Sequence, residues 1–322
     1  MRMRLTARGG RPLTLAEQEN RAGLIFITPT VVIVLIAVVV PILWTIFIAF
    51  RELRLRDLRA VGIFGSTFTL DNFVNVITSR GFLDAMTTTV IYSVVGTLLA
   101  IGLGLAAALI VWRPFRGRTI VRASMLLPYV TPVVAVTFIW SVMLDPNLGI
   151  VNALGKDVLG WEKPIPFLSQ RAADISILGF QVEVPVALIT VIVFQAWRYF
   201  PFAFLFLLAR LQAVPADLDE AARVDGATPI QRFRYILLPQ LAGVIGLLVV
   251  LRFIWTFNEF DDIYLLTGGG AGTEVVSVGI YNQLIGRGDI GSAAALSLVL
   301  AALLCILLLI YFRRQSRGEA VP

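Results

Sequence analysis

The residue types that usually carry out catalysis are nearly absent from this chain. It contains no histidine and a single cysteine, Cys305, which lies within an apolar run. Because histidine is the commonest general base and metal ligand, the sequence lacks a Ser/His/Asp triad, a Cys/His dyad and a histidine-based zinc site. One cysteine cannot form a disulfide within the chain. We therefore expect no catalytic residue and no metal site.

Polar side chains inside the long apolar runs are the first candidates for binding, because such groups are costly there and usually face a cavity or a partner helix. The candidates for a substrate path are Gln195, Tyr199, Arg252, Trp255, Asn258 and Asp261. Trp255 and Asn258 are three residues apart and so share a helix face. An aromatic ring beside a planar amide is chemically suited to a sugar.

Two other interpretations remain open for these residues. Tyr199, together with Trp140 and Trp197, can belong to the aromatic belt at a membrane interface. Arg252 can pair with Glu259 or with an acid on another subunit.

The stretch from Gly149 to Lys156 has a superficial likeness to a phosphate-binding loop. It has one residue too many before Gly155-Lys156, and Asp157 stands where Ser or Thr is required. The chain therefore carries no nucleotide loop of its own.

A second group of polar residues, which we call the polar segment, occupies positions 215–239 between two long apolar runs. Pro215 suits the first turn of a short helix, and the acids that follow, including Glu220, suit its positive N-terminal end. Gly226, after Asp225, is placed to end this helix in the left-handed conformation.

A second short helix is expected in the same segment. Thr228 is its N-cap candidate, Pro229 its first residue, and Pro239 its end before the next apolar run. A polar, two-part helical segment between apolar runs indicates that something on the aqueous side binds it. A loop that only touches lipid headgroups is the other interpretation, but anionic headgroups prefer basic helices over acidic ones.

The composition is that of a membrane protein with several spans. The 322 residues are 58% hydrophobic and 15% charged, with a mean hydropathy of +0.85, whereas soluble proteins have about 25% charged residues. Six apolar runs reach the length of about 20 residues that a bilayer requires. They are residues 24–50, 90–112, 120–144, 186–211, 241–264 and 291–312. We predict an all-α bundle of six transmembrane helices, with residues 24–312 as one membrane domain between the tails 1–23 and 313–322.

The arginines predict the orientation, because cytoplasmic loops of membrane proteins are enriched in Arg and Lys. They are concentrated in both tails, in the loop between the second and third runs, and in the polar segment. This places both termini and the polar segment in the cytoplasm, and it explains the net charge of +6 without nucleic acid. The first outer loop is an exception, with Arg51, Arg54, Arg56, Arg59 and Arg80.

Prolines and glycines within the runs have packing as their simplest explanation. Pro29, Pro41, Pro128, Pro132 and Pro201 are expected to kink helices, and hinges of a rocking bundle are the alternative. The second run carries three glycines that are expected to allow close helix packing: Gly96, Gly102 and Gly104.

The polar segment also resembles a known family motif. The pattern is Glu-Ala-Ala, three residues, Gly, nine residues, Ile, one residue and Leu-Pro, and it is similar to the signature loop of binding-protein-dependent ABC importer permeases. Its positions here are Glu220, Ala221, Ala222, Gly226, Ile236, Leu238 and Pro239. The segments at residues 126–140, 149–152 and 258–281 resemble the permeases of the maltose type, in particular the subunit with the larger outer loop.

This resemblance implies a set of partners and an activity. In that family the loop is a coupling helix that binds in a cleft of a cytoplasmic ATPase, so the ATPase-coupling residues are expected to be the seven above with Asp225. The implied assembly contains a second permease subunit, a pair of ATPase subunits that bind ATP and Mg²⁺, and an extracytoplasmic solute-binding protein. No cofactor is expected on this chain. The implied location is the bacterial cytoplasmic (inner) membrane.

The expected function is import of a mono-, di- or oligosaccharide by a non-catalytic permease subunit. Glycerol phosphate or a related polyol or phosphodiester is the alternative solute. A stand-alone secondary transporter is disfavoured, because the chain shows neither inverted repeats nor acids deep in its apolar runs. A membrane enzyme is disfavoured by the missing histidine.

Overall fold

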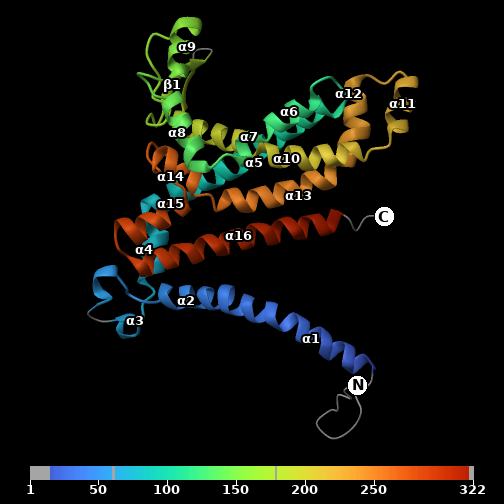
Figure 1. Cartoon of the computed structure of the whole chain (residues 1–322). Coiled ribbons are helices and arrows are strands. Elements are labelled where there is room, and N and C mark those ends of the chain that lie inside the picture. The colour runs from blue at the N-terminus through green and yellow to red at the C-terminus, as the bar shows by residue number, and fades with distance from the viewer. Residues whose placement is uncertain (1–14, 60–61, 178–179, 319–322) are drawn as a thin grey trace.

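The computed structural model describes residues 15–59, 62–177 and 180–318, and most of these residues are helical (Figure 1). Four arginines of the expected N-terminal tail, Arg2, Arg4, Arg8 and Arg11, lie outside the described residues. The α-helices are α1 (Leu15–Val34), α2 (Val40–Ala49), α3 (Gly62–Gly65), α4 (Asp71–Thr78), α5 (Arg80–Trp112), α6 (Arg118–Met125), α7 (Leu127–Val130), α8 (Val133–Met143), α9 (Ile150–Leu159), α10 (Val186–Gln212), α11 (Ala216–Val224), α12 (Pro229–Arg232), α13 (Leu238–Phe257), α14 (Asp261–Thr267), α15 (Val276–Tyr281) and α16 (Ile290–Gly318).

Short irregular helices and one hairpin complete the described chain. A 3₁₀ turn, η2, covers Leu55–Asp57, and π-helical turns form η1 (Leu35–Val39), η3 (Phe233–Leu237) and η4 (Asn282–Gly286). The strands β1 (Ala173–Ile177) and β2 (Phe180–Val184) pair antiparallel, with Ala173 opposite Val184.

Five described helices are long and apolar enough to cross a membrane, and a bent pair is a sixth if it is counted as one span. The five are Gly23–Ala49, Arg80–Trp112, Val186–Gln212, Pro229–Phe257 and Ile290–Arg313, and the bent pair is Arg118–Val130 with Val133–Met143. The second of these helices, α5, begins ten residues before the expected start at residue 90, with Arg80 in its first turn. The prediction of several membrane-spanning helices is confirmed.

The expected third span is not a straight helix. It bends by 96° between α7 and α8, where Thr131 takes the extended conformation (φ −68°, ψ 136°). The cause is Pro132, because the residue before a proline is pushed out of the helical region.

Pro41 and Pro239 do not interrupt their helices. The π-helical turns η1 and η3 end two residues before Pro41 and Pro239, respectively. A wider turn moves the carbonyl groups away from the proline ring, so that the helix continues. Our expectation that Pro239 closes the second helix of the polar segment is therefore wrong, because α12, η3 and α13 form one unit, Pro229–Phe257.

The fifth span also ends earlier than expected. Its helix stops at Phe257, where Asn258 leaves the helical conformation (φ −100°, ψ 9°). A separate short helix, α14, starts at Asp261. The acids at 259–262 therefore lie at a break between helices instead of within a continuous span.

The closest packing in the bundle is between α5 and α10. A Cβ on Gly104 would lie 2.7 Å from Ala203 Cβ and 2.8 Å from the Phe204 backbone nitrogen, and a Cβ on Gly96 would lie 2.5 Å from Gln195 Oε1. Both glycines allow close packing, as expected. Gly102 does not, since a Cβ there meets nothing within 4 Å.

The basic first outer loop uses its arginines within the subunit. Arg51 Nη1 donates to the Ser66 carbonyl at 2.7 Å, and the guanidinium lies 4.6 Å from the Phe47 ring centroid. The backbone of Arg54 forms an isolated β-bridge with Asp289, which does not involve the arginine charge. The contacts of the Arg51 guanidinium therefore account for part of the charge that departs from the expected pattern.

The two ends of the bundle differ (Figure 1). The start of α1, the end of α16 and the helices α11 and α12 lie at one end, and α9, the strands, α4, α14 and α15 lie at the other. At this second end, between α8 and α9, the backbone N–H groups of Leu148 and Asn147 donate to the Asp145 carboxylate, each at 2.8 Å. These bonds lower the pKa of Asp145 from its usual value.

Candidate functional site

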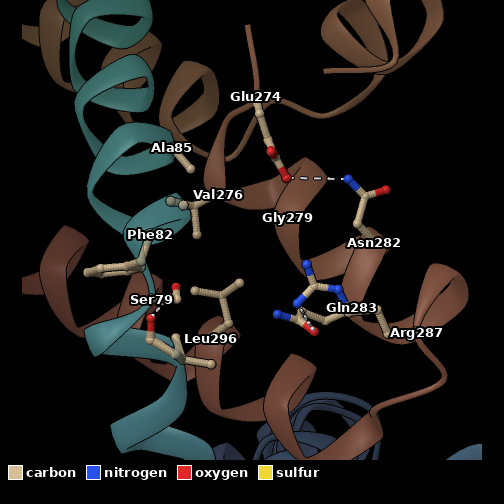
Figure 2. Close-up of a pocket in the computed structure, with 12 residues that line it drawn as sticks. Ser79, Phe82, Ala85, Glu274, Val276, Gly279, Asn282, Gln283, Arg287 and Leu296 are labelled. Carbon is tan, nitrogen blue, oxygen red and sulfur yellow. Dashed lines mark hydrogen bonds between the residues drawn. The ribbon is translucent and has the colours of Figure 1, made fainter. Parts of the chain in front are cut away.

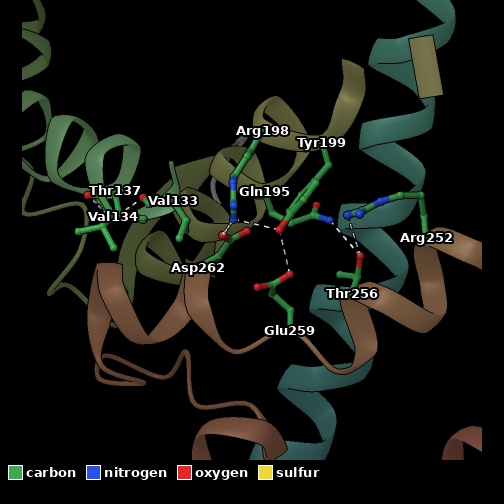
Figure 3. A network of polar contacts seen from close by, with 10 residues as sticks. All are labelled: Val133, Val134, Thr137, Gln195, Arg198, Tyr199, Arg252, Thr256, Glu259 and Asp262. Atoms are coloured by element: carbon green, nitrogen blue, oxygen red, sulfur yellow. Dashed lines mark hydrogen bonds and ion pairs between the residues drawn. The ribbon is translucent and has the colours of Figure 1, made fainter. Parts of the chain in front are cut away.

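A polar network ties α10 to the end of α13 and the start of α14 (Figure 3). Its members are Gln195, Arg198, Tyr199, Arg252, Thr256, Glu259 and Asp262. Two arginines face two carboxylates, so the formal charges balance. Charges that are buried away from water are costly unless they are paired and hydrogen-bonded. The network supplies both kinds of contact.

The ion pair of the network joins Arg198 on α10 to Asp262 on α14. Asp262 is fully buried, and the Arg198 side chain is 13% exposed. Arg198 Nη1 also donates to the Tyr199 hydroxyl at 2.9 Å, and that hydroxyl donates to Glu259 Oε2 at 3.1 Å. The charge of Arg198 is thus shared between the two acids, one directly and one through a phenol.

Arg252 is held by a hydroxyl and an aromatic ring. The residue is 2% exposed, its Nη2 donates to Thr256 Oγ1 at 3.0 Å, and its guanidinium lies 4.0 Å from the Tyr199 ring centroid. Gln195 Nε2 donates to the same Thr256 Oγ1 at 3.1 Å. A cation over an aromatic face contributes about 0.5–2 kcal/mol.

Three of the six substrate-path candidates meet in this network: Gln195, Tyr199 and Arg252. The other three do not join it. Trp255 is 46% exposed and its ring lies 5.1 Å from that of Phe202. Asn258 is exposed and its Nδ2 donates to the Ile254 carbonyl at 2.8 Å. Asp261 is exposed at the start of α14.

The contacts of Arg252 and of the tryptophans bear on the two other interpretations of these residues. Arg252 bonds to Thr256, while Glu259 accepts from Tyr199, so the described contacts do not show the alternative pair of Arg252 with Glu259. Trp140 and Trp197 have ring centroids 5.4 Å apart and pack, half-buried, against a core cluster that contains Phe194. These two tryptophans therefore contribute to packing within the subunit.

Sequence reasoning did not assign Thr256 and Asp262 to the candidate path. The signal for an acid was present, because Arg198 lies within an apolar run and requires a counter-charge. The choice between Asp261 and Asp262 depends on which side of α14 faces α10, and that follows from the break at residues 258–260.

The polar segment has the first short helix that its sequence predicts, α11, and the start of the second, which continues into α13. Gly226 is left-handed with φ +77° and follows Asp225, the C-cap of α11. Thr228 forms a capping box with Gln231: Gln231 N donates to Thr228 Oγ1 at 3.3 Å, and Thr228 N donates to Gln231 Oε1 at 2.8 Å. Pro229 is the first residue of α12, as expected.

Most of the expected ATPase-coupling residues are open to solvent. Glu220, Ala221, Asp225 and Gly226 are exposed, and Ala222 is half-buried. The remaining three belong to the long helix of the fifth span: Ile236 and Leu238, which are half-buried, and Pro239, which is exposed. The segment therefore presents a free helix, α11, at one end of the bundle (Figure 1).

The chain matches a family model over residues 100–317, and this match covers more than half of its length. The model describes a "binding-protein-dependent transport system inner membrane component". The chain belongs to this family. It is thus a multi-pass inner-membrane permease component, and the resemblance read from the polar segment is confirmed.

Curated relatives of this permease cover most of its length. It is 35% identical over 252 residues to the inner membrane ABC transporter permease protein YcjO of Escherichia coli (strain K12), covering 78% of this chain and 81% of YcjO. It is 31% identical to the trehalose/maltose transport system permease protein MalF of Thermococcus litoralis, covering 93% of this chain and 95% of MalF.

A solved structure shares the fold of the permease. This is a chain of a bacterial ABC transporter involved in the import of the acidic polysaccharide alginate. The two match with a TM-score of 0.76 and 22% identity, over 96% of this chain and 99% of that chain. The permease therefore shares its overall fold with a chain of an ABC transporter.

Proposed function

We propose that this permease is one of two membrane subunits of an ABC importer for a carbohydrate, a mono-, di- or oligosaccharide. An extracytoplasmic binding protein delivers the solute, and ATP with Mg²⁺ is hydrolysed on a separate pair of cytoplasmic ATPase subunits. The observation that carries the proposal is the similarity over 93% of the chain to a trehalose/maltose permease.

The polar segment is the proposed contact with the ATPase. It connects α10 to α12 and α13, so a force on α11 acts on both long helices. About 14 residues of α10, or roughly 20 Å of helix, separate the end of α10 from Arg198. At the level of Arg198, the polar network joins α10 to α13 and α14. In this proposal α10 and α13 therefore move together as a rigid unit.

The proposed substrate path divides into two roles. Gln195 is fully buried and Arg252 is 2% exposed, so they shape the path by holding α10 and α13 together, with Tyr199 between them. Trp255, Asn258 and Asp261 are exposed and are the residues free to contact solute in the assembled transporter.

The transport proposal is tested in the complete complex, reconstituted in proteoliposomes with its ATPase and loaded binding protein. We expect Gly226→Asp to lower uptake and ATPase stimulation tenfold or more, the change that about 1.4 kcal/mol produces. The reason is that a side chain in the left-handed conformation strains the turn after α11. Glu220→Ala is expected to act in the same direction.

Gly117→Asp is the matched control. Gly117 is also left-handed, with φ +86°, and lies in the loop between α5 and α6, outside the polar segment. Normal coupling in Gly226→Asp, with the ATPase still co-purifying, would exclude the proposed contact.

A third variant in the same assay tests the proposed substrate path. Trp255→Ala is expected to lower uptake while the complex still assembles. Unchanged uptake kinetics would remove Trp255 from the path. Uptake of sn-glycerol 3-phosphate in place of every sugar offered would instead establish the alternative solute class.

A further inference from the structure

A pocket of about 150 Å³ lies at the end of the bundle opposite α11, between α4, α5, α15, η4 and α16 (Figure 2). It is separate from the polar network, with which it shares no lining residue. Its lining consists of Val76, Ser79, Gly81, Phe82, Ala85, Glu274, Val276, Gly279, Asn282, Gln283, Arg287 and Leu296.

The polar side of the pocket consists of planar hydrogen-bonding groups. Asn282 Nδ2 donates to Glu274 Oε1 at 3.3 Å, and Arg287 Nη1 donates to Gln283 Oε1 at 3.4 Å. Both distances exceed the usual 2.7–3.2 Å, so these are weak bonds. Glu274 and Arg287 are exposed. Ligand hydroxyl groups can therefore replace these bonds at low cost.

The opposite side of the pocket is apolar. Phe82, Val276 and Leu296 face the polar groups across the cavity (Figure 2). A Cβ on Gly279 would lie 3.7 Å from both Glu274 Oε1 and Leu296 Cδ2, so it would point between two lining side chains. The glycine keeps this part of the cavity open.

The charges of the lining balance. Glu274 is the acid and Arg287 the base of the pocket, which leaves no surplus cation for a phosphate. One adjoining pocket shares Ser79, Gln283 and Arg287 and adds Arg54 and Asp289.

A second adjoining pocket, on another side, shares Gly81 and Glu274 and adds Asp84 and Arg171. The added charges balance in each case. The three pockets therefore form a series of neighbours with shared lining residues, and their combined lining is formally neutral.

We propose that this series binds an uncharged di- or oligosaccharide, with one glycosyl unit in the central pocket. Glu274, Asn282, Gln283 and Arg287 contact the hydroxyl groups, and Phe82 contacts an apolar face of the ring. The inference rests on the proposed carbohydrate transport and adds to it a second solute site on this subunit, away from Trp255 and Asn258.

The test measures binding and transport separately. Binding of maltose, trehalose, raffinose and sn-glycerol 3-phosphate to the purified full-length permease in lipid nanodiscs is measured by saturation-transfer NMR. We expect at least one neutral sugar to bind and sn-glycerol 3-phosphate not to bind. Glu274→Gln should weaken sugar binding about tenfold, because a hydrogen bond to a charged group is lost. Gly279→Val should weaken it by narrowing the cavity.

Glu162→Gln, which alters an exposed carboxylate after α9, is the matched control and should bind normally. Thermal unfolding shows whether each variant is folded, and Gly279→Ala replaces Gly279→Val if the latter is not. Sugar binding unchanged in Glu274→Gln and in the Gly279 variant, or no binding of any neutral sugar, overturns the inference. Sugar uptake by the wild-type complex is measured separately. If the wild-type complex takes up sugar but the variants bind sugar normally, this second site alone is rejected. If the wild-type complex takes up no sugar, the proposed function is rejected.

Discussion

Asp262 is the most deeply buried acid of the polar network, and Arg198 is its ionic partner. Its position could not be read from the sequence, in which Asp261 and Asp262 are adjacent. One of them is fully buried and the other exposed, because neighbouring residues of a helix point in different directions. The presence of a counter-charge for Arg198 was predictable; the residue that supplies it was not.

Replacing Asp262 with Asn should therefore destabilise the folded permease by about 3–5 kcal/mol, since it leaves Arg198 buried without its counter-charge. The measurement is the thermal unfolding midpoint of purified protein in nanodiscs. Asp261→Asn is the control, and its midpoint should stay near that of the wild type. Equal midpoints for the two variants would show that the ion pair has no structural role.

At the scale of elements, α5 and α10 approach closely because of two glycines. Gly96 and Gly104 both face α10, whereas Gly102 faces open space. The sequence predicted three packing glycines because small residues favour helix contact in membranes. It could not distinguish Gly102, because the side of α5 that meets α10 depends on how the two helices are rotated against each other.

Gly104→Ala should destabilise the permease by about 1–3 kcal/mol, because the new Cβ would lie within 3 Å of backbone atoms of α10. Gly102→Ala provides the comparison, with a neutral or slightly stabilising effect, since alanine favours helix over glycine. The measurement is the thermal unfolding midpoint of each variant, and Gly104→Ala should have the lower one. A lower midpoint for Gly102→Ala would contradict the described packing.

Prolines show the same limit of sequence reasoning. Pro132 breaks the third span, but Pro41 and Pro239 lie within continuous helical units. A π-helical turn precedes each of the latter two, whereas Pro29 and Pro201 lie inside α-helices without one. The presence of a proline therefore does not by itself decide whether a helix breaks.

For the whole molecule, the distribution of arginines predicts the polar segment and both termini in the cytoplasm. The start of α1, the end of α16 and α11 do lie at one end of the bundle (Figure 1). The assignment of this end to the cytoplasm is a proposal, and single cysteines can test it because the native chain has only Cys305.

In a Cys305→Ala background, Lys163→Cys should react with a membrane-impermeant maleimide added to intact spheroplasts. Ala221→Cys should react only after the membrane is permeabilised. The background protein alone is the blank. Labelling of Ala221→Cys in intact spheroplasts would show that the orientation is the opposite of the proposed one.

By itself, the sequence determined the class of protein, the approximate spans and the local structure of the polar segment. These depend on hydrophobic run length and on short-range signals such as Gly226, Thr228 and Pro229. The tertiary structure decided which polar groups meet, as in Arg198 with Asp262 and in the pocket of Glu274 and Arg287. Such contacts join residues far apart in the chain, and they depend on helix rotation and on breaks that hydrophobicity does not encode.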